Sequence, residues 1–382
     1  MKIALLILML TGFSLIRDGF ISSDEAVNLQ MVKNMQEDPV RFTVRPSYDP
    51  GGHEDWERDS LSHILMTPVF HYIIYLGSFL LPLELSKFSF LVQATILILL
   101  ILFSMSFISK YDKADSNNLP EIFMLSLLPI FMFLQVEHEG MMTCFGFISL
   151  FLALSGLKDS KTIHFALSGF FLGLAFLIKL WLIAPFVLGL IAILIYTIFR
   201  KDFSIVQLLK YSMVLIISFG LTSSVHAFFV MLNSPQDIYA WLNHVYFGVI
   251  TGAGDYGKKA LGEGGWAQPF YYYVYALTRD LLPVFPLLLA VLWSITKNAK
   301  NLLISKLDIG LFGILLGVII LSFNGTKEPL YILPAYFAVL LFLSKNILNL
   351  RLSRIEYKKI SMVNILFLLT FFGAIFNFNL SK

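Results

Sequence analysis

The sequence predicts an all-α polytopic membrane protein with about eleven transmembrane helices, and three observations support this fold class. First, 57% of the 382 residues are hydrophobic, only 14% are charged, and the mean hydropathy is +0.77. An ordinary soluble domain carries about 25% charged residues. Second, the apolar residues form continuous runs that can cross about 30 Å of hydrocarbon, without the alternation of a membrane β-barrel. Third, the connectors between many of these runs are short and basic.

The composition also argues against several other classes of protein. A net charge of +3 is too small to suggest a nucleic-acid partner. The single cysteine, Cys144, lies inside an apolar run, so we expect neither a disulfide framework nor a thiolate metal cluster. The glycine-rich stretch 252–266 lacks the spacing and the following helix of a nucleotide-binding loop. We therefore expect a single integral membrane domain over residues 1–382.

The predicted spans begin at the amino terminus. Lys2 and the apolar run after it could form a secretory signal, but Arg17 and Asp18 follow instead of a small-residue cleavage site. We therefore interpret residues 1–16 as a retained first span. Ten further spans are expected near residues 86–109, 119–136, 140–157, 162–178, 182–199, 208–232, 269–295, 303–323, 329–344 and 359–380.

One of these runs, 269–295, contains Arg279 and Asp280. If the run were one straight span, both charges would be buried in the bilayer, as an intramembrane functional pair would be. We prefer the alternative that residues 269–280 lie along the outer interface and that the span begins near Leu281.

Basic connectors determine the expected topology. The stretches 110–118, 158–161, 200–207, 296–302 and 345–358 are rich in lysine and arginine, and the positive-inside rule places them in the cytoplasm. All five share that side only if the apolar stretch 64–82 does not cross the membrane, so we expect it at the outer interface. The outer side then holds a first loop with interfacial helices, 17–85, and a second large loop, 233–268.

The most conspicuous polar group on the outer side is the acidic pair Asp24 and Glu25. It begins the segment SDEAVNLQMVKNM, whose apolar residues approximate one helical face: Val27, Leu29, Met31, Val32 and Met35. A surface helix with favourable acids in its first turn would explain the pair without any chemistry. A carboxylate at a membrane surface can also serve as a general base. Both interpretations stay open.

A second group of polar residues lies between two spans, where Glu137, His138 and Glu139 form an acid–histidine–acid cluster. A solvated turn would explain it. Metal binding would need further ligands, and no second histidine lies at a ligand spacing such as i+4. No metal ligand is assigned, and whether a divalent metal assists is left open.

Cations form the third group of candidates. Lys179 ends the run GLAFLIK, and Lys327 lies in TKEPLYILP. Either lysine could merely extend its ammonium group to the interface, as long basic side chains commonly do. A site that handles a phosphate, however, needs cations where negative charge accumulates. His226 and His244 can be explained as ordinary interfacial histidines.

Taken in order, four parts of the sequence resemble the GT-C superfamily of polyprenyl-phosphate-sugar-dependent glycosyltransferases. They are DEAVNLQMVKNM, GFFLGLAFLIKLWLIAPFVLGL, WLNHVYFGVITG with QPFYYYVYALTRDLLPVFP, and LSFNGTKEPLYILPAYFAVLLFL. The branch that they resemble most contains the protein O-mannosyltransferases and the lipid A aminoarabinose transferases. Two departures stand out. The family often has a basic or aromatic residue where this chain has Asn28, and SHILMTPVFH matches its His-Pro-Pro stretch only loosely.

The resemblance implies a membrane glycosyltransferase, either a hexosyl- or a pentosyltransferase, that acts by inverting displacement. Asp24 would be the base, and Glu25 would position the acceptor. Four cationic candidates would hold the lipid phosphate: Lys179, Lys327, His244 and Arg279. The partners would be a polyprenyl-phosphate-linked sugar donor, a lipid, glycan or protein acceptor, and membrane lipids, with no nucleic acid. The site would face the noncytoplasmic side of a bacterial plasma (inner) membrane.

Two other classes of function compete with a transferase. A transporter or flippase of a lipid-linked or anionic substrate should have polar residues at mid-span depth, and few are present apart from Arg279 and Asp280. A noncatalytic assembly subunit would not need matched acidic and basic groups on one face. The glycosyltransferase is therefore the favoured prediction.

Overall fold

Every regular element in the described part of the chain is a helix. The computed structural model describes residues 23–37, 69–80, 83–112, 118–124, 126–134, 138–233, 271–281, 284–297, 305–321 and 329–347. The helices along the bundle are α6 (Leu85–Phe107), α9 (His138–Asp159), α10 (Thr162–Lys179), α11 (Ala184–Arg200), α12 (Ile205–Asn233), α17 (Phe285–Lys297), α18 (Lys306–Leu321) and α19 (Leu333–Asn346). The other α-helices are α2 (Ser23–Glu37), α5 (Val69–Ser78), α7 (Leu119–Met124), α8 (Leu127–Leu134) and α16 (Tyr272–Asp280). Short turns of π- or 3₁₀-helix form η1 (Ile108–Asp112), η2 (Leu180–Ile183) and η6 (Pro329–Ile332).

Several of these helices can cross a membrane. Among the described residues, four stretches are long and apolar enough: Leu85–Tyr111, His138–Asp159, Thr162–Lys179 and Ile205–Val225. The bent pair of α16 and α17 would add a fifth if it is counted as one span. The protein is therefore an integral membrane protein with several spans. The total of about eleven spans stays a prediction.

Close approach of backbones holds part of the bundle together. A side chain at Gly189 of α11 would lie 2.9 Å from the carbonyl oxygen of Gly310, and one at Gly313 of α18 would lie 2.7 Å from the Cα atom of Gly189. Only glycine fits such a contact, as is common where membrane helices cross. The remaining core is rich in phenylalanine. The ring of Phe147 contacts those of Phe186 and Phe337 at centroid distances of 5.2 and 4.7 Å.

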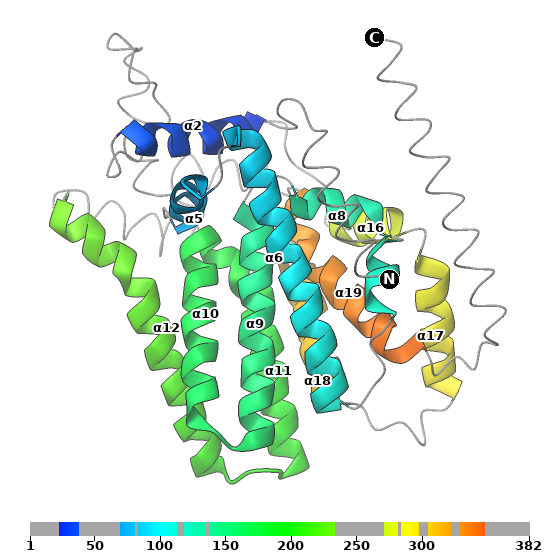
Figure 1. Ribbon diagram of the computed structural model, residues 1–382. Coiled ribbons are helices and arrows are strands. Elements are labelled where there is room, and N and C mark those ends of the chain that lie inside the picture. Colours follow the sequence, from blue (N-terminus) through cyan, green and yellow to red (C-terminus); the bar gives the residue numbers. More distant parts are fainter. Residues whose placement is uncertain are drawn as a thin grey trace.

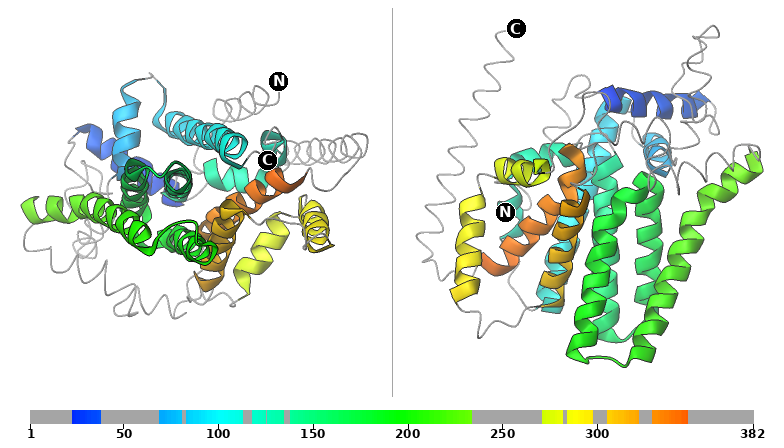
Figure 2. Two further views of the ribbon diagram at one scale, coloured as in Figure 1. Left: turned by 90° about the horizontal axis from the view of Figure 1, so that it is seen from below. Right: turned by 180° about the vertical axis from the view of Figure 1, so that it is seen from behind.

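Two helices lie across one end of the bundle. Figures 1 and 2 show α2 running crosswise above the ends of the long helices, with α5 directly beneath it. A ten-residue helix such as α5 is about 15 Å long, which is half of the hydrocarbon thickness. That the stretch 64–82 as a whole does not span the membrane stays a prediction.

The opposite end of the bundle carries the basic connectors. Lys158 donates hydrogen bonds to the carbonyl oxygens of Lys110 and Tyr111 at 3.2 and 3.1 Å, which joins the ends of α9 and α6. The carboxylate of Asp202, just after α11, lies 2.9 Å from the ammonium group of Lys306 at the start of α18. Each contact joins two helix ends, and Figure 1 shows both pairs at the end of the bundle opposite α2.

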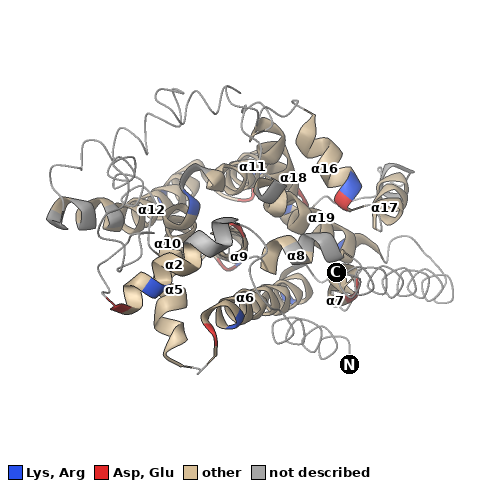
Figure 3. Cartoon of the chain, turned by 90° about the horizontal axis from the view of Figure 1, so that it is seen from above, with Lys and Arg blue, Asp and Glu red and all other residues tan. Residues whose placement is uncertain are grey.

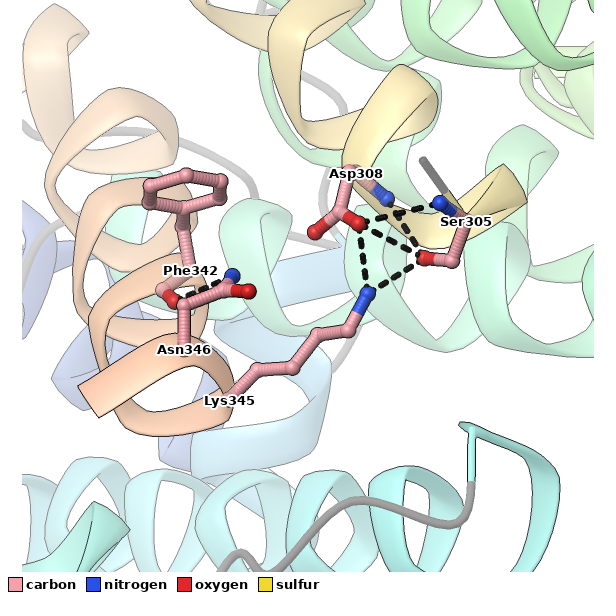
Figure 4. A network of polar contacts seen from close by, with 5 residues as sticks. All are labelled: Ser305, Asp308, Phe342, Lys345 and Asn346. Carbon is pink, nitrogen blue, oxygen red and sulfur yellow. Dashed lines mark hydrogen bonds and ion pairs between the residues drawn. The ribbon is translucent and has the colours of Figure 1, made fainter. Parts of the chain in front are cut away.

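A capping arrangement at this end ties α18 to α19 (Figure 4). The hydroxyl of Ser305 accepts a bond from the Asp308 N–H at 3.2 Å, and the Asp308 carboxylate accepts one from the Ser305 N–H at 3.1 Å. Such a reciprocal pair satisfies backbone donors at the start of a helix. Lys345 of α19 then approaches the same carboxylate to 2.6 Å and also donates to the Ser305 hydroxyl.

The expected single helix over residues 119–136 is a wrong prediction. The structure has two short helices there, α7 and α8, of six and eight residues, and neither can cross a bilayer alone. The break precedes Pro129, which has no N–H to donate and whose ring would clash with the carbonyl group of residue 125 in a continuous helix. The second helix starts at Leu127, so that Pro129 falls in its first turn, where the missing N–H costs little.

The run 269–295 is also divided into two helices. The axes of α16 and α17 differ by 102°, and α16 ends at Asp280. In Figure 1, α16 lies across the same end of the bundle as α2, while α17 runs along the bundle. One straight span over 269–295 is thereby excluded, and the interfacial position of residues up to 280 stays a prediction.

Candidate active site

The acidic pair lies at the start of α2. This helix begins at Ser23, so that Asp24 and Glu25 stand in its first turn. Their side chains are outside the described part of the structure, as is that of Val27. The predicted apolar face is otherwise confirmed, because the other four predicted side chains are all buried: Leu29, Met31, Val32 and Met35.

Asn28 is also buried on this helix, and it bonds to α5. Its side-chain oxygen lies 3.0 Å from Nε2 of His71, which is fully buried. An amide oxygen can only accept, so Nε2 of the imidazole carries the proton and donates it. Burial lowers the pKa of His71 to about 3, so the ring is uncharged at neutral pH. The sequence contained His71 in an ambiguous stretch, and nothing in its spacing indicated this partner.

His71 also contacts the start of α9, and so connects that helix to the crosswise helices α2 and α5. The rings of His71 and His138 meet edge to face at a centroid distance of 5.2 Å, and Phe70 contacts both. His138 and Glu139 are the first two residues of α9, and both are buried. The solvated turn that the sequence allowed for these two residues is therefore a wrong interpretation.

Glu139 forms an ion pair with Lys179 at the end of α10. The two charged atoms, Oε1 and Nζ, are 2.9 Å apart, although the contact is not aligned as a hydrogen bond. The Glu139 side chain is 1% exposed, whereas that of Lys179 is 27% exposed. The ammonium group also lies 5.9 Å from the ring centre of Tyr331 in η6. Lys179 therefore does more than extend to the interface, because a buried carboxylate holds it at the water boundary.

Arg279 belongs to a second cluster, on α16. Its Nε atom lies 2.5 Å from the carboxylate of Asp280, which is 0% exposed, whereas the arginine side chain is 48% exposed. The hydroxyl of Tyr336 in α19 donates to the other oxygen of the same carboxylate. The guanidinium group lies 5.6 Å from the ring centre of Tyr275. Asp280 thus ties α16 to α19 and holds Arg279 outward.

The structure brings only part of the predicted site together. One end of the bundle holds the first turn of α2, His138, Glu139 and Lys179, and Figure 3 looks down on this end, where α2 and α5 lie over α9 and α10. Three predicted site residues lie outside the described part of the chain: Glu137, His244 and Lys327. Among the described residues, no group of three or more histidine, cysteine, aspartate or glutamate side chains is placed to hold a metal ion.

Comparison with known proteins gives matches of structure alone. No protein-family model matches the sequence, and no curated protein does. A crystal structure of ArnT from Cupriavidus metallidurans bound to undecaprenyl phosphate superposes with a TM-score of 0.67 at 17% sequence identity. The apo form of the same protein superposes with a TM-score of 0.64 at the same identity. The chain has the GT-C fold of ArnT.

The match to ArnT extends over nearly all of this chain. It covers 94% of the chain but only 61% of ArnT in the lipid-bound form, and 60% in the apo form. The chain therefore spans about three fifths of the length of ArnT. ArnT is a lipid A aminoarabinose transferase, the branch that the motifs resemble, so the resemblance is confirmed at the level of the fold.

Proposed function

We propose that the protein is a glycosyltransferase that moves a sugar from a polyprenyl-phosphate donor to an acceptor on the noncytoplasmic face of a bacterial plasma membrane. One observation carries this proposal: the Lys179–Glu139 ion pair lies at the same end of the bundle as the helix that begins with Asp24 and Glu25. A phosphate-binding cation and a general base are the two parts that such a transfer needs. The GT-C fold supports it, since ArnT with this fold has been crystallised with undecaprenyl phosphate.

The proposed reaction is a single displacement at the anomeric carbon. Asp24 accepts the proton of the acceptor hydroxyl or amine while that atom forms its bond to the sugar, and Glu25 positions the acceptor. The bond between the sugar and the phosphate oxygen breaks, and its electron pair stays on the phosphate. The products are the glycosylated acceptor, with inverted configuration, and the polyprenyl phosphate.

Lys179 is the described cation best placed to stabilise the leaving phosphate. An ammonium group has three N–H donors, so Lys179 can bind a phosphate oxygen while it stays beside Glu139. Arg279 of the second cluster, and Lys327 and His244 outside the described residues, are further candidates for the same role. Because the apolar tail of the lipid stays in the bilayer, a site at the membrane boundary suits a donor of this class.

Substitution of the acidic pair tests the proposal. Asp24→Asn should lower turnover of a purified polyprenyl-phosphate sugar by about 10²–10⁴-fold, or roughly 3–5 kcal/mol, because asparagine keeps the shape but cannot accept the proton. Glu25→Gln should lose less. The rates are measured with full-length protein in nanodiscs, and binding of the donor should survive in both variants.

If the acidic pair only stabilises the start of α2, the opposite result is expected. An acid that only favours the helix dipole from the first turn of α2 contributes about 0.3–1 kcal/mol of stability, so Asp24→Asn would then be about as active as the wild type. Near-normal turnover by that variant would overturn the assignment of Asp24 as the base. A wild-type protein that moves the intact lipid across the membrane without transferring sugar would instead favour a flippase.

A further inference from the structure

A buried polar pair joins the two crosswise helices. Asn28 of α2 and His71 of α5 are both buried, and their side chains meet at 3.0 Å. The Nε2 proton of His71 is used in this bond, which leaves Nδ1 as a lone-pair acceptor with no hydrogen-bond partner among the described residues. A polar group buried in this way costs free energy unless it is hydrogen-bonded. The Asn28–His71 bond is therefore favourable only in a position of α2 on α5 that lets the two side chains meet.

Much of the rest of this contact is apolar, apart from an exposed hydrogen bond between Gln36 and Ser78. Leu29 and Val32 of α2 belong to the same buried core as Phe70 and Ile74 of α5. Apolar side chains would let one helix slide on the other at little cost, since hydrophobic contact is not directional. A buried hydrogen bond makes one register better than its neighbours, because any shift breaks a directional contact away from water. The Asn28–His71 pair therefore selects the register of α2 on α5.

That register sets the place of the acidic turn. Asp24 precedes Asn28 by four residues, which is about one turn, or 6 Å along a helix axis. On the other side of the pair, the His71 ring contacts His138, the neighbour of Glu139 in the ion pair with Lys179. Asn28 and His71 thus connect the turn that carries Asp24 to the end of α9.

We propose that Asn28 and His71 are positioning residues, whose hydrogen bond fixes α2 so that the acidic turn keeps its place relative to Lys179. This inference rests on the proposed glycosyl transfer. A shift of about 1 Å in a catalytic group can lower a rate by about 10²-fold, so loss of the bond should act on turnover. It should act little on the affinity for the lipid, which depends on other groups.

The test uses two measurements on full-length protein in nanodiscs. The variants are Asn28→Leu, His71→Leu, His71→Gln and the exchange variant Asn28→His with His71→Asn. The first measurement is amide hydrogen exchange in α2, which needs no activity. The second is kcat and KM for a purified polyprenyl-phosphate sugar.

The two leucine variants should exchange the amides of α2 faster and should lower kcat by about 10–100-fold, with KM changed by no more than about twofold. His71→Gln keeps an N–H that can donate to Asn28, so it should stay within about threefold of wild-type kcat. The exchange variant should recover part of both losses. Gln36→Leu is the matched control, because Gln36 also bonds to α5, through Ser78 at 3.0 Å, but at an exposed site twelve residues from Asp24.

Two results would overturn the inference. Unchanged exchange in α2 of both leucine variants would show that the bond does not hold the helix, and faster exchange with wild-type kcat would show that the register does not matter for transfer. Failure of the proposed function looks different: the wild type itself would transfer no sugar, while the leucine variants would still exchange faster in α2.

Discussion

Both charged clusters contain a buried carboxylate beside a partly exposed cation. Glu139 and Asp280 are almost fully buried, and each holds a cation that reaches water, Lys179 and Arg279. The acid is the costly member of such a pair, because an uncompensated charge away from water is expensive. Each acid therefore keeps its cation at the surface, where a lipid phosphate could meet it.

This pairing predicts that Lys179 has two separable roles. Lys179→Ala should lower both transfer and stability, the latter by about 3 kcal/mol, because it leaves Glu139 buried and uncompensated. The double variant Lys179→Met with Glu139→Gln removes both charges and should recover most of the stability but none of the transfer. Thermal midpoints in detergent and turnover of a polyprenyl-phosphate sugar measure the two effects.

The control for this prediction is Glu139→Gln alone, which keeps the cation and should lose less transfer than Lys179→Ala. If the double variant transferred sugar at the wild-type rate, Lys179 would not bind the phosphate. The lysine would then serve only to neutralise Glu139.

For single residues, the sequence predicted which side chains belong to the candidate site better than it predicted what those side chains contact. Lys179, Arg279, His138 and Glu139 could be singled out, because charged and polar residues are rare next to long apolar runs. Their partners could not, because spacing along the chain carries no information on contacts between helices. Asn28 and His71 are 43 positions apart, and Tyr336 is 56 positions from Asp280.

Among the helices, α12 packs mainly against α10. Most of its large apolar side chains are exposed, and in Figures 1 and 2 it leans away from the bundle toward the end that carries α2. The contact centres on Gly169 and Gly173 of α10, where an added Cβ atom would lie 2.2 Å from the carbonyl oxygen of Leu215 and 2.6 Å from the Cβ atom of Thr222. The hydroxyl of Ser218 adds a bond to the carbonyl oxygen of Ala166 at 2.6 Å.

This contact predicts a sharp difference between two glycines. Gly169→Val should destabilise the protein by about 1–3 kcal/mol, because the side chain would push α12 away from α10. Gly220→Ala on α12 is the control, since nothing lies within 4 Å of its added Cβ atom, and it should be neutral or slightly stabilising. Thermal unfolding in detergent compares the two, and equal midpoints would contradict the packing argument.

The helices were predicted more reliably than the breaks between them. Runs of apolar residues located α6, α9, α10, α11 and α12 to within a few positions, because the bilayer sets the length of a span. The break between α7 and α8 was missed, because Pro129 lies in a run whose composition is otherwise that of one helix. The turn at the end of α16 could be predicted, because a charged pair in the middle of a span is costly.

At the scale of the whole molecule, the two ends of the bundle differ in character. The α2 end holds the Asn28–His71 bond and the Lys179–Glu139 and Arg279–Asp280 pairs, while the opposite end holds the basic connectors around Lys110, Lys158 and Lys345. The positive-inside rule assigns the second end to the cytoplasm. On this assignment we expect the candidate site on the noncytoplasmic side, which stays a prediction.

Labelling of single cysteines tests this topology. In a background in which Cys144 is replaced by serine, Lys33→Cys and Lys327→Cys should react with an impermeant reagent in intact spheroplasts. Lys161→Cys and Lys201→Cys should react only after permeabilisation. Lys33, Lys161 and Lys201 are exposed, so their labelling reports sidedness instead of burial. Labelling of position 327 only after permeabilisation would place it on the cytoplasmic side and contradict the proposed active face.

The contacts at the α2 end also bear on how the protein is made. The contacting residues are far apart in the sequence. His138 follows His71 by 67 positions, Lys179 follows Glu139 by 40, and Tyr331 follows Lys179 by 152. A ribosome makes these residues in order, so the acidic turn is synthesised long before its surroundings exist. It follows that a nascent chain carries Asp24 without an assembled site, and that this end of the protein is completed only after Tyr331 has been made.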